Sequence, residues 1–234
     1  MPSSNPHEPT SQQDRTQSEK TERQQPSQRR SKSAEEIADA YADVADKLAR
    51  WRQLDRLFAG QYRRRQFEHA NGRVLDVACG TGRNFRYLSR SSEVVGIDIS
   101  NEMLGHARDE LDRLGLDGTV RQMDAQALDF SENSFDTVIS SFSTCTFPDP
   151  IAALHEMERV CTPDGEILLL EHSRSDAAPL AWFQDWRAES HYEKNGCRLN
   201  HDPLKTVEQA GLTVDTASTA FLGLVTTIVA IPSR

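Results

Sequence analysis

The feature that most limits how this chain can fold is a short apolar run that ends in a pair of glycines. Residues 74–77 read Val-Leu-Asp-Val, and Gly80-Thr81-Gly82 follows shortly after. Near-adjacent glycines let backbone N–H groups approach a ligand closely, and a helix that begins behind them favours a negative group. Residues 74–85 are therefore predicted to be a buried strand, a ligand-binding loop and the start of a helix.

Short apolar runs and amphipathic stretches alternate after this point. A link of only a few residues joins the last two expected strands, which makes that pair antiparallel. The pattern predicts an α/β fold in which a mostly parallel sheet has helices on both faces and ends in a C-terminal antiparallel hairpin. The expected strands are 73–77, 93–97, 119–122, 135–139, 165–170, 213–219 and 224–231, and the clearest helices are 101–114, 150–160 and 204–211.

The N-terminal region has a different character from the rest of the chain. Residues 1–33 contain one large apolar residue, Met1, so a disordered tail is expected there. Ser33 is the expected N-cap of a helix because Glu36 follows three residues later, and apolar residues then recur at helical spacing. We therefore expect a tail (1–33), an N-terminal helical lead-in or lid (34–70) and one α/β domain (71–234).

Charge, hydropathy and cysteine spacing exclude several classes of protein. The 27 basic and 36 acidic residues give a net charge of -9, which repels nucleic-acid phosphates, so no nucleic-acid partner is expected. No apolar run is long enough to span a membrane, and the first thirty residues lack a secretory signal, so we expect a cytoplasmic protein. The four cysteines are widely spaced without a Cys-x-x-Cys pair, and no metal site is expected.

An acidic residue after the second expected strand defines the ligand more closely. Asp98 ends that strand 22 residues after Asp76, where a carboxylate can accept hydrogen bonds from both ribose hydroxyls. A dinucleotide fingerprint would need glycine at position 85, and Phe85 stands there instead. The pair of features therefore indicates a ribose-containing ligand, with NAD as the weaker interpretation.

Three segments taken in order resemble the motifs of class I S-adenosylmethionine-dependent methyltransferases. Asp76–Gly82 is similar to the first motif, with Ala78 in place of its first glycine, and 96–104 and 123–125 are similar to the second and third. The similarity extends through 134–139 and 154–165. The resemblance implies a Rossmann-like, seven-stranded sheet and S-adenosyl-L-methionine as the cofactor.

The same resemblance implies roles for individual residues in the cofactor site. Gly80 and Gly82 would contact the methionine part of the cofactor, Asp76 its amine, and Asp98 its ribose. The other implied contacts are Ala78 in the glycine loop, Ile99 and Met103 at the adenine face, Asp124 and Ala125 at the adenine edge, and Ser140 beside the methionine tail.

The acceptor site is less defined, and no catalytic residue is assigned. Methyl transfer is an in-line displacement that depends mainly on alignment, and it needs a base only when the acceptor arrives protonated. His172 is the best-placed residue for such contact. Trp182 and Trp186 lie at helical spacing, where they could roof an acceptor pocket, touch a membrane surface as a peripheral contact, or pack a helix onto the sheet.

The resemblance is greatest to the small-molecule branch of the family, which includes quinone, phosphatidylethanolamine and thiol methyltransferases. It implies an enzyme that methylates a small, lipophilic acceptor. Because no catalytic residue is evident, a catalytically silent regulatory module that binds S-adenosylmethionine is the main alternative. A nicotinamide-dependent oxidoreductase is a third.

Overall fold

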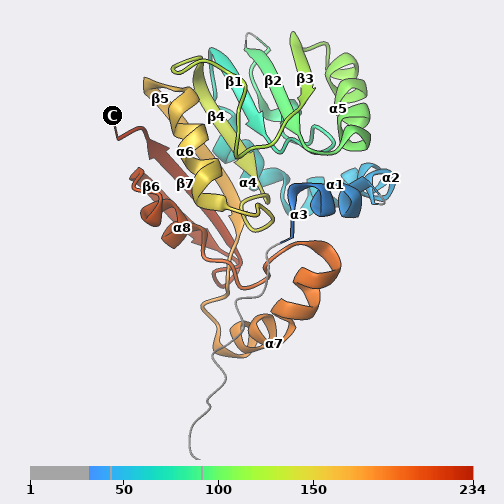
Figure 1. The fold of residues 1–234 in the computed structure, drawn as a ribbon, viewed down its shortest axis with the longest axis vertical. Helices are drawn as coiled ribbons and strands as arrows, with labels where there is room; N and C mark the ends of the chain where they lie inside the picture. The colour runs from blue at the N-terminus through green and yellow to red at the C-terminus, as the bar shows by residue number, and fades with distance from the viewer. Residues whose placement is uncertain (1–31, 43, 91, 234) are drawn as a thin grey trace, which may run out of the picture. The chain divides into compact units, whose positions relative to one another are not determined.

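The computed structural model describes residues 32–42, 44–90 and 92–233, so nearly all of the predicted disordered tail lies outside the described residues. The described part contains a seven-stranded sheet with the strand order β3-β2-β1-β4-β5-β7-β6 (Figure 1). Its strands are β1 (Arg73–Val77), β2 (Glu93–Asp98), β3 (Gly118–Gln122), β4 (Phe135–Ser141), β5 (Cys161–His172), β6 (Thr213–Ala220) and β7 (Val225–Ile231).

The direction of the strands agrees with the sequence pattern. Strands β1 to β5 pair in parallel, whereas β7 is antiparallel to both β5 and β6. The predicted Rossmann-like sheet with a C-terminal antiparallel hairpin is thus confirmed. Strand β1 has β2 on one side and β4 on the other, so the chain reverses its direction of winding there, and ligands bind beyond the carboxyl ends of strands at such a point.

Side-chain caps begin the helices that cover the sheet. Helix α5 (Asn101–Leu114) is capped by Ser100, whose Oγ accepts from the Met103 N–H at 3.3 Å. Helix α6 (Pro150–Val160) is capped by Asp149, which accepts from the Ile151 and Ala152 N–H groups at 3.1 and 3.0 Å. Helices α7 (Ala178–Asn195) and α8 (Pro203–Gln209) follow β5.

Side chains along β1 point alternately to the two faces of the sheet, and each face packs into a different hydrophobic cluster. Leu75 and Val77 belong to the cluster that includes residues of α6 and α8. Val74 belongs to the other cluster, together with Phe67 and Leu104. Because side chains two apart on a strand share a face, Asp76 points to the same side as Val74, where a buried carboxylate requires polar partners.

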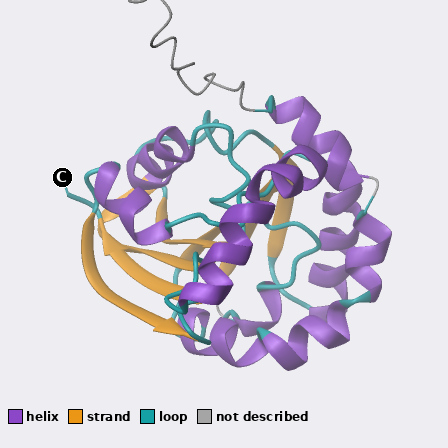
Figure 2. Ribbon diagram, turned by 90° about the horizontal axis from the view of Figure 1, so that it is seen from below, coloured by secondary structure: helices purple, strands orange, loops and turns teal. Residues whose placement is uncertain are grey.

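In the described part of the chain before the sheet, the structure has four short helices: α1 (Ala34–Ala42), α2 (Ala45–Arg50), α3 (Arg52–Phe58) and α4 (Gly60–Phe67). The predicted cap of α1 is confirmed, because the Glu36 N–H donates to Ser33 Oγ at 3.2 Å and the Ser33 N–H donates to the Glu36 carboxylate at 2.7 Å. Phe67 at the end of α4 is fully buried. Seen from below in Figure 2, helices and loops lie in front of and to the right of the strands, and strands form the left edge of the view.

The helix predicted to begin behind the glycine loop does not form. Residues 80–84 are turns, and only a 3₁₀ helix, η1 (Phe85–Tyr87), follows. Two side chains account for the difference: Phe85 is fully buried beneath the loop, and the Asn84 amide donates to Asp76 at 3.0 Å instead of facing solvent. The dipole of a regular helix is therefore not available at the glycine loop.

The two glycines of the loop are expected to respond differently to alanine. At Gly82, with a φ of +74°, a Cβ would lie 2.7 Å from two ring carbons of Phe85, so strain and overlap should lower the free energy of unfolding by about 2 kcal/mol or more. At Gly80, with a φ of +55°, no atom lies within 4 Å of a Cβ, and Gly80→Ala should cost only about 1 kcal/mol from backbone strain. Urea denaturation measures both, and equal losses would contradict this packing.

Candidate active site

A cavity of about 480 Å³ lies at the switch point between β1 and β4, beside the ends of β1, β2 and β4. Sites for small molecules commonly have this size. Residues of α1 to α4 line the cavity on the side opposite the strand ends. The predicted cofactor residues that line it are Ala78, Gly80, Asp98, Ile99, Met103, Asp124 and Ala125.

Asp98 is held in place by the backbone. One carboxylate oxygen accepts from the Gly80 N–H at 2.9 Å, and the other accepts from the Ser100 N–H at 2.9 Å. The carboxylate also lines the cavity, where its oxygens can accept hydrogen bonds from a ligand. Burial raises the pKa of Asp98, although the backbone N–H donors of Ser100, Gly80 and Ile99 oppose that shift. This arrangement suits recognition of two adjacent hydroxyl groups.

The two glycines contribute in different ways. Gly80 lines the cavity, and the space beside its Cα is open. Gly82 is not among the cavity-lining residues, because the space that its missing Cβ leaves is occupied by the ring of Phe85. Gly80 therefore borders the cavity, as the implied cofactor contact requires. Gly82 packs against Phe85 instead and does not line the cavity.

Asp76 lies behind the cavity wall. Its side chain is fully buried, and both of its oxygens accept from the Asn84 amide, at 3.0 and 3.1 Å. Burial raises the pKa of Asp76 to about 7, against the opposing effects of Asn84 and Arg63. Asp76 is absent from the cavity lining, so it can act on a bound amine only through these partners or through water.

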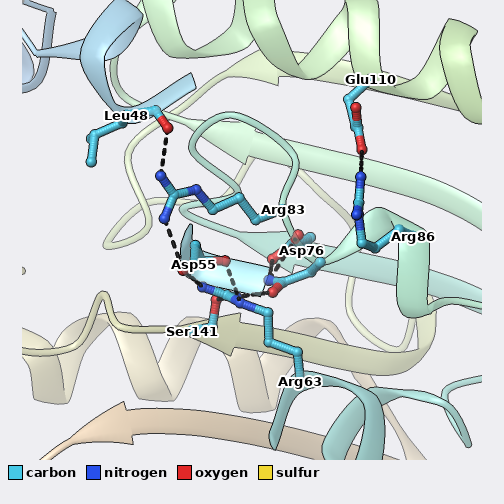
Figure 3. Close-up of polar contacts among 9 residues, drawn as sticks. Leu48, Asp55, Arg63, Asp76, Arg83, Arg86, Glu110 and Ser141 are labelled. Carbon is cyan, nitrogen blue, oxygen red and sulfur yellow. Dashed lines mark hydrogen bonds and ion pairs between the residues drawn. The ribbon is translucent and has the colours of Figure 1, made fainter. Parts of the chain in front are cut away.

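Arg63 joins the helical lead-in to the glycine loop and to β4 (Figure 3). Its guanidinium group donates to Asn84 Oδ1 and to Ser141 Oγ, and it forms an ion pair with Asp55 of α3 at 3.4 Å. Arg83 in the glycine loop binds the same Asp55 at 2.9 Å. A buried charge is tolerated only with such partners, so the network fixes α3 and α4 over the loop.

Ser140 lies inside the sheet and not on the cavity. Its side chain is fully buried, and its hydroxyl donates to the Val77 carbonyl at 2.8 Å. The next residues, Ser141, Phe142 and Ser143, line the cavity instead, because the chain leaves the sheet there with Phe142 at a φ of +54°. The motif therefore predicted the correct strand end, but the side chains that line the cavity there are those of the residues after Ser140.

The loop after β4 contributes apolar side chains to the cavity lining. Phe142 and Phe147 line it from this loop, and Ile37 and Tyr41 line it from α1. The Glu171 carboxylate supports the loop by accepting from the Ser143 N–H at 3.1 Å. A polar region around Asp98 and an apolar region around these aromatic rings therefore belong to one cavity.

The residues predicted for the acceptor pocket lie elsewhere. His172 is absent from the cavity lining, and its Nε2 lies 3.1 Å from the Cys197 sulfur. Trp182 and Trp186 on α7 are 67% and 63% exposed, and their rings stack with centroids 6.1 Å apart. These tryptophans neither roof the cavity nor pack α7 onto the sheet.

Helices α3 and α4 lie within the predicted lead-in or lid, but none of their residues was predicted to belong to the site. Asp55 and Arg63 line the cavity, and Ala59, which joins the two helices, does so as well. The signal was present in the spacing, because Ala59, Arg63 and the buried Phe67 recur every four residues and therefore share one helix face. An arginine on an otherwise apolar helix face indicates that its charged group points into the protein.

Comparison with known proteins agrees with this site. A family model described as a methyltransferase domain matches residues 74–165. Phosphatidylethanolamine N-methyltransferase of Cereibacter sphaeroides is 38% identical over 167 residues, which are 63% of this chain and 78% of that protein. The chain is 41% identical over 115 residues to the ubiquinone/menaquinone biosynthesis C-methyltransferase UbiE of Pasteurella multocida, covering 47% of this chain but only 43% of that relative.

A solved structure extends the likeness to the whole fold. The crystal structure of a SAM-dependent methyltransferase from Aquifex aeolicus matches with a TM-score of 0.61 and 21% identity, covering 82% of this chain and 98% of that one. The chain belongs to the class I S-adenosylmethionine-dependent methyltransferases, and S-adenosylmethionine is its cofactor. The open space beside Gly80 and the acceptor positions on Asp98 fit that cofactor.

The raised pKa of Asp76 predicts a pH dependence of stability. The folded-state pKa is about 7 and the ordinary value is 3.8, so folding favours the protonated carboxyl group. The free energy of unfolding should therefore fall by about 2–4 kcal/mol as pH rises from about 4 to about 7, and it should fall less in Asp76→Asn. Urea denaturation of the ligand-free protein at several pH values measures the difference.

The matched control is Asp129→Asn, which removes an exposed carboxylate. That variant should keep the pH dependence of the unsubstituted protein. An unchanged pH dependence in Asp76→Asn would contradict the assignment of the raised pKa to Asp76.

Proposed function

We propose that the protein transfers the methyl group of S-adenosylmethionine to a small, lipophilic acceptor by in-line displacement. The observation that carries the proposal is the continuity of the cavity. Its lining combines the polar groups of Asp98 and Gly80 with the apolar side chains of Ile37, Phe142 and Phe147. An apolar acceptor and the cofactor would therefore share one cavity.

The residues of this chain would mainly bind and align the reactants. The cofactor, when bound, supplies a methyl group on a positively charged sulfur, whose leaving group is a neutral thioether. Asp98 would hold the ribose hydroxyls, Met103 and Ile99 would lie against the adenine, and Asp124 with Ala125 would border its edge. Correct alignment of two reactants can contribute about 7–11 kcal/mol to lowering a barrier.

Exclusion of water would be the task of the N-terminal helices. Residues of α1 to α4 cover the cavity, and the ion pairs of Asp55 with Arg63 and Arg83 hold them against the glycine loop. A covered cavity keeps water away from the reacting atoms. The apolar side chains of Ile37 and Leu48 on this cover would favour a lipophilic acceptor over a charged one.

We further propose that the protein meets its acceptor at a membrane surface on the cytoplasmic side. Among the described residues, no helix is both long and apolar enough to cross a bilayer. Helix α7 follows β5 (Figure 1), which ends at the same edge of the sheet as the strands beside the cavity. The exposed apolar side chains of α7 are Leu180, Trp182, Phe183 and Trp186. Tryptophan is typical of membrane interfaces, and one relative is named for a phospholipid substrate.

Removal of the Asp98 carboxylate should abolish tight cofactor binding. Asp98→Ala is expected to lower the affinity for S-adenosylhomocysteine, the demethylated cofactor, by about tenfold to a thousandfold, because two charge-assisted hydrogen bonds are lost. Isothermal titration calorimetry measures this affinity. Asp117→Asn removes an exposed carboxylate and should bind normally. Normal binding by Asp98→Ala would exclude the proposed ribose contact.

Turnover separates the enzyme from a silent cofactor-binding module. The protein would be incubated with methyl-labelled S-adenosylmethionine and, separately, a phospholipid with an amine headgroup, a quinone precursor and an apolar thiol. Label in one product, and none with Asp98→Ala, is the expected result. Cofactor binding without transfer to any of these acceptors or to a total lipid extract would favour the silent module.

The tryptophans of α7 should matter for membrane contact and not for the cofactor. The double substitution Trp182→Ser and Trp186→Ser is expected to reduce sedimentation with phosphatidylcholine–phosphatidylethanolamine vesicles by about tenfold or more, because two large apolar side chains no longer enter the interface. Affinity for S-adenosylhomocysteine should not change. Trp51→Ser, the matched control, should sediment normally. Equal sedimentation of all variants would rule out α7 as the contact.

A further inference from the structure

Two cysteines and a histidine meet outside the cavity just described. Cys145 lies in the loop after β4, His172 ends β5, and Cys197 follows α7. The Cys145 and Cys197 sulfurs are 3.5 Å apart, and Nε2 of His172 is 3.1 Å from the Cys197 sulfur. All three ligand atoms lie within 4.8 Å of one another. Because these three residues are far apart in the sequence, their spacing did not predict that they would meet.

The Cys145–Cys197 and His172–Cys197 separations are close to those around a tetrahedral metal ion. Bonds of about 2.3 Å to sulfur and about 2.0–2.1 Å to nitrogen place neighbouring ligand atoms about 3.6–3.8 Å apart. The sulfurs here are already at nearly that spacing, and the imidazole nitrogen is nearer by about half an ångström, which a small rotation of the ring corrects. The cysteines are free, and their sulfurs are well beyond the roughly 2.05 Å of a disulfide.

The surrounding backbone holds the ligands in place. Gly196 adopts the left-handed conformation at the end of α7, with a φ of +69°, and turns the chain so that Cys197 faces β5. The Arg198 N–H and its guanidinium group both donate to the Cys145 carbonyl, at 3.2 and 3.3 Å. Three segments from different parts of the sequence are thus fixed around one point.

We propose that Cys145, His172 and Cys197 bind one zinc ion. Two thiolates and an imidazole form a donor set that suits zinc, and three protein ligands leave the fourth coordination position to water. The ion would connect the loop after β4 and the segment after α7 to the end of β5. Ser143, Thr146 and Phe147 of that loop line the cavity, so the metal would stabilise the cavity wall without depending on which acceptor is methylated.

Metal analysis of the full-length, tag-free protein purified under reducing conditions without chelator tests the site. Plasma mass spectrometry should find about one zinc ion per chain in the unsubstituted protein. Cys145→Ser and Cys197→Ser should each lose most of it. The matched control Cys161→Ser, which makes the same change in a thiol buried in the core, should keep it. Retention of zinc by Cys197→Ser would overturn the proposal.

A second measurement on the unsubstituted protein applies if a variant fails to fold. The protein is stripped with a chelator and titrated with Co²⁺, and saturation at about one ion per chain with thiolate-to-cobalt charge-transfer absorption and tetrahedral d–d bands is expected. Absence of those bands in the reduced protein would refute the site. A Cys145–Cys197 disulfide in freshly purified protein, found by non-reducing peptide mass analysis, would refute it as well.

Discussion

The hydrogen bonds that the Asp98 carboxylate accepts from Gly80 and Ser100 determine the arrangement of the cofactor site. They connect the end of β2 to the loop after β1 and to the N-cap of α5. A carboxylate so largely buried would be unstable without them, because its charge has lost most of its water. The same carboxylate lines the cavity, so one residue both organises the loop and borders the space in which we propose that the ribose binds.

The covering helices depend on a second set of buried charges. Arg63 bridges Asp55, Ser141 and Asn84, and Asn84 in turn satisfies Asp76. A network of this kind is stable only when each member has its partner, so the helices and the glycine loop are expected to become ordered together. The helices over the cavity are thereby coupled to the glycine loop, beside which the cofactor binds.

Much of this could be predicted from the sequence because local signals agreed with the global pattern. The predicted helix 150–160 has the bounds of α6, and Asp98, chosen by its spacing from Asp76, lines the cavity. Other features depended on tertiary packing that periodicity does not contain. Phe85 fills the space below Gly82 and prevents a helix, and the Ser140 side chain is held inside the sheet by the Val77 carbonyl, so that its neighbours line the cavity instead. The meeting of Cys145 with Cys197 follows from the path of α7, which no spacing rule shows.

The most direct test of the central claim is a crystal structure of the protein with S-adenosylhomocysteine bound. The adenosyl group should occupy the cavity at the ends of β1 and β2, with both ribose hydroxyls donating to the Asp98 carboxylate and the adenine beside Met103. A ligand bound elsewhere, or one in the cavity whose ribose makes no contact with Asp98, would contradict the account.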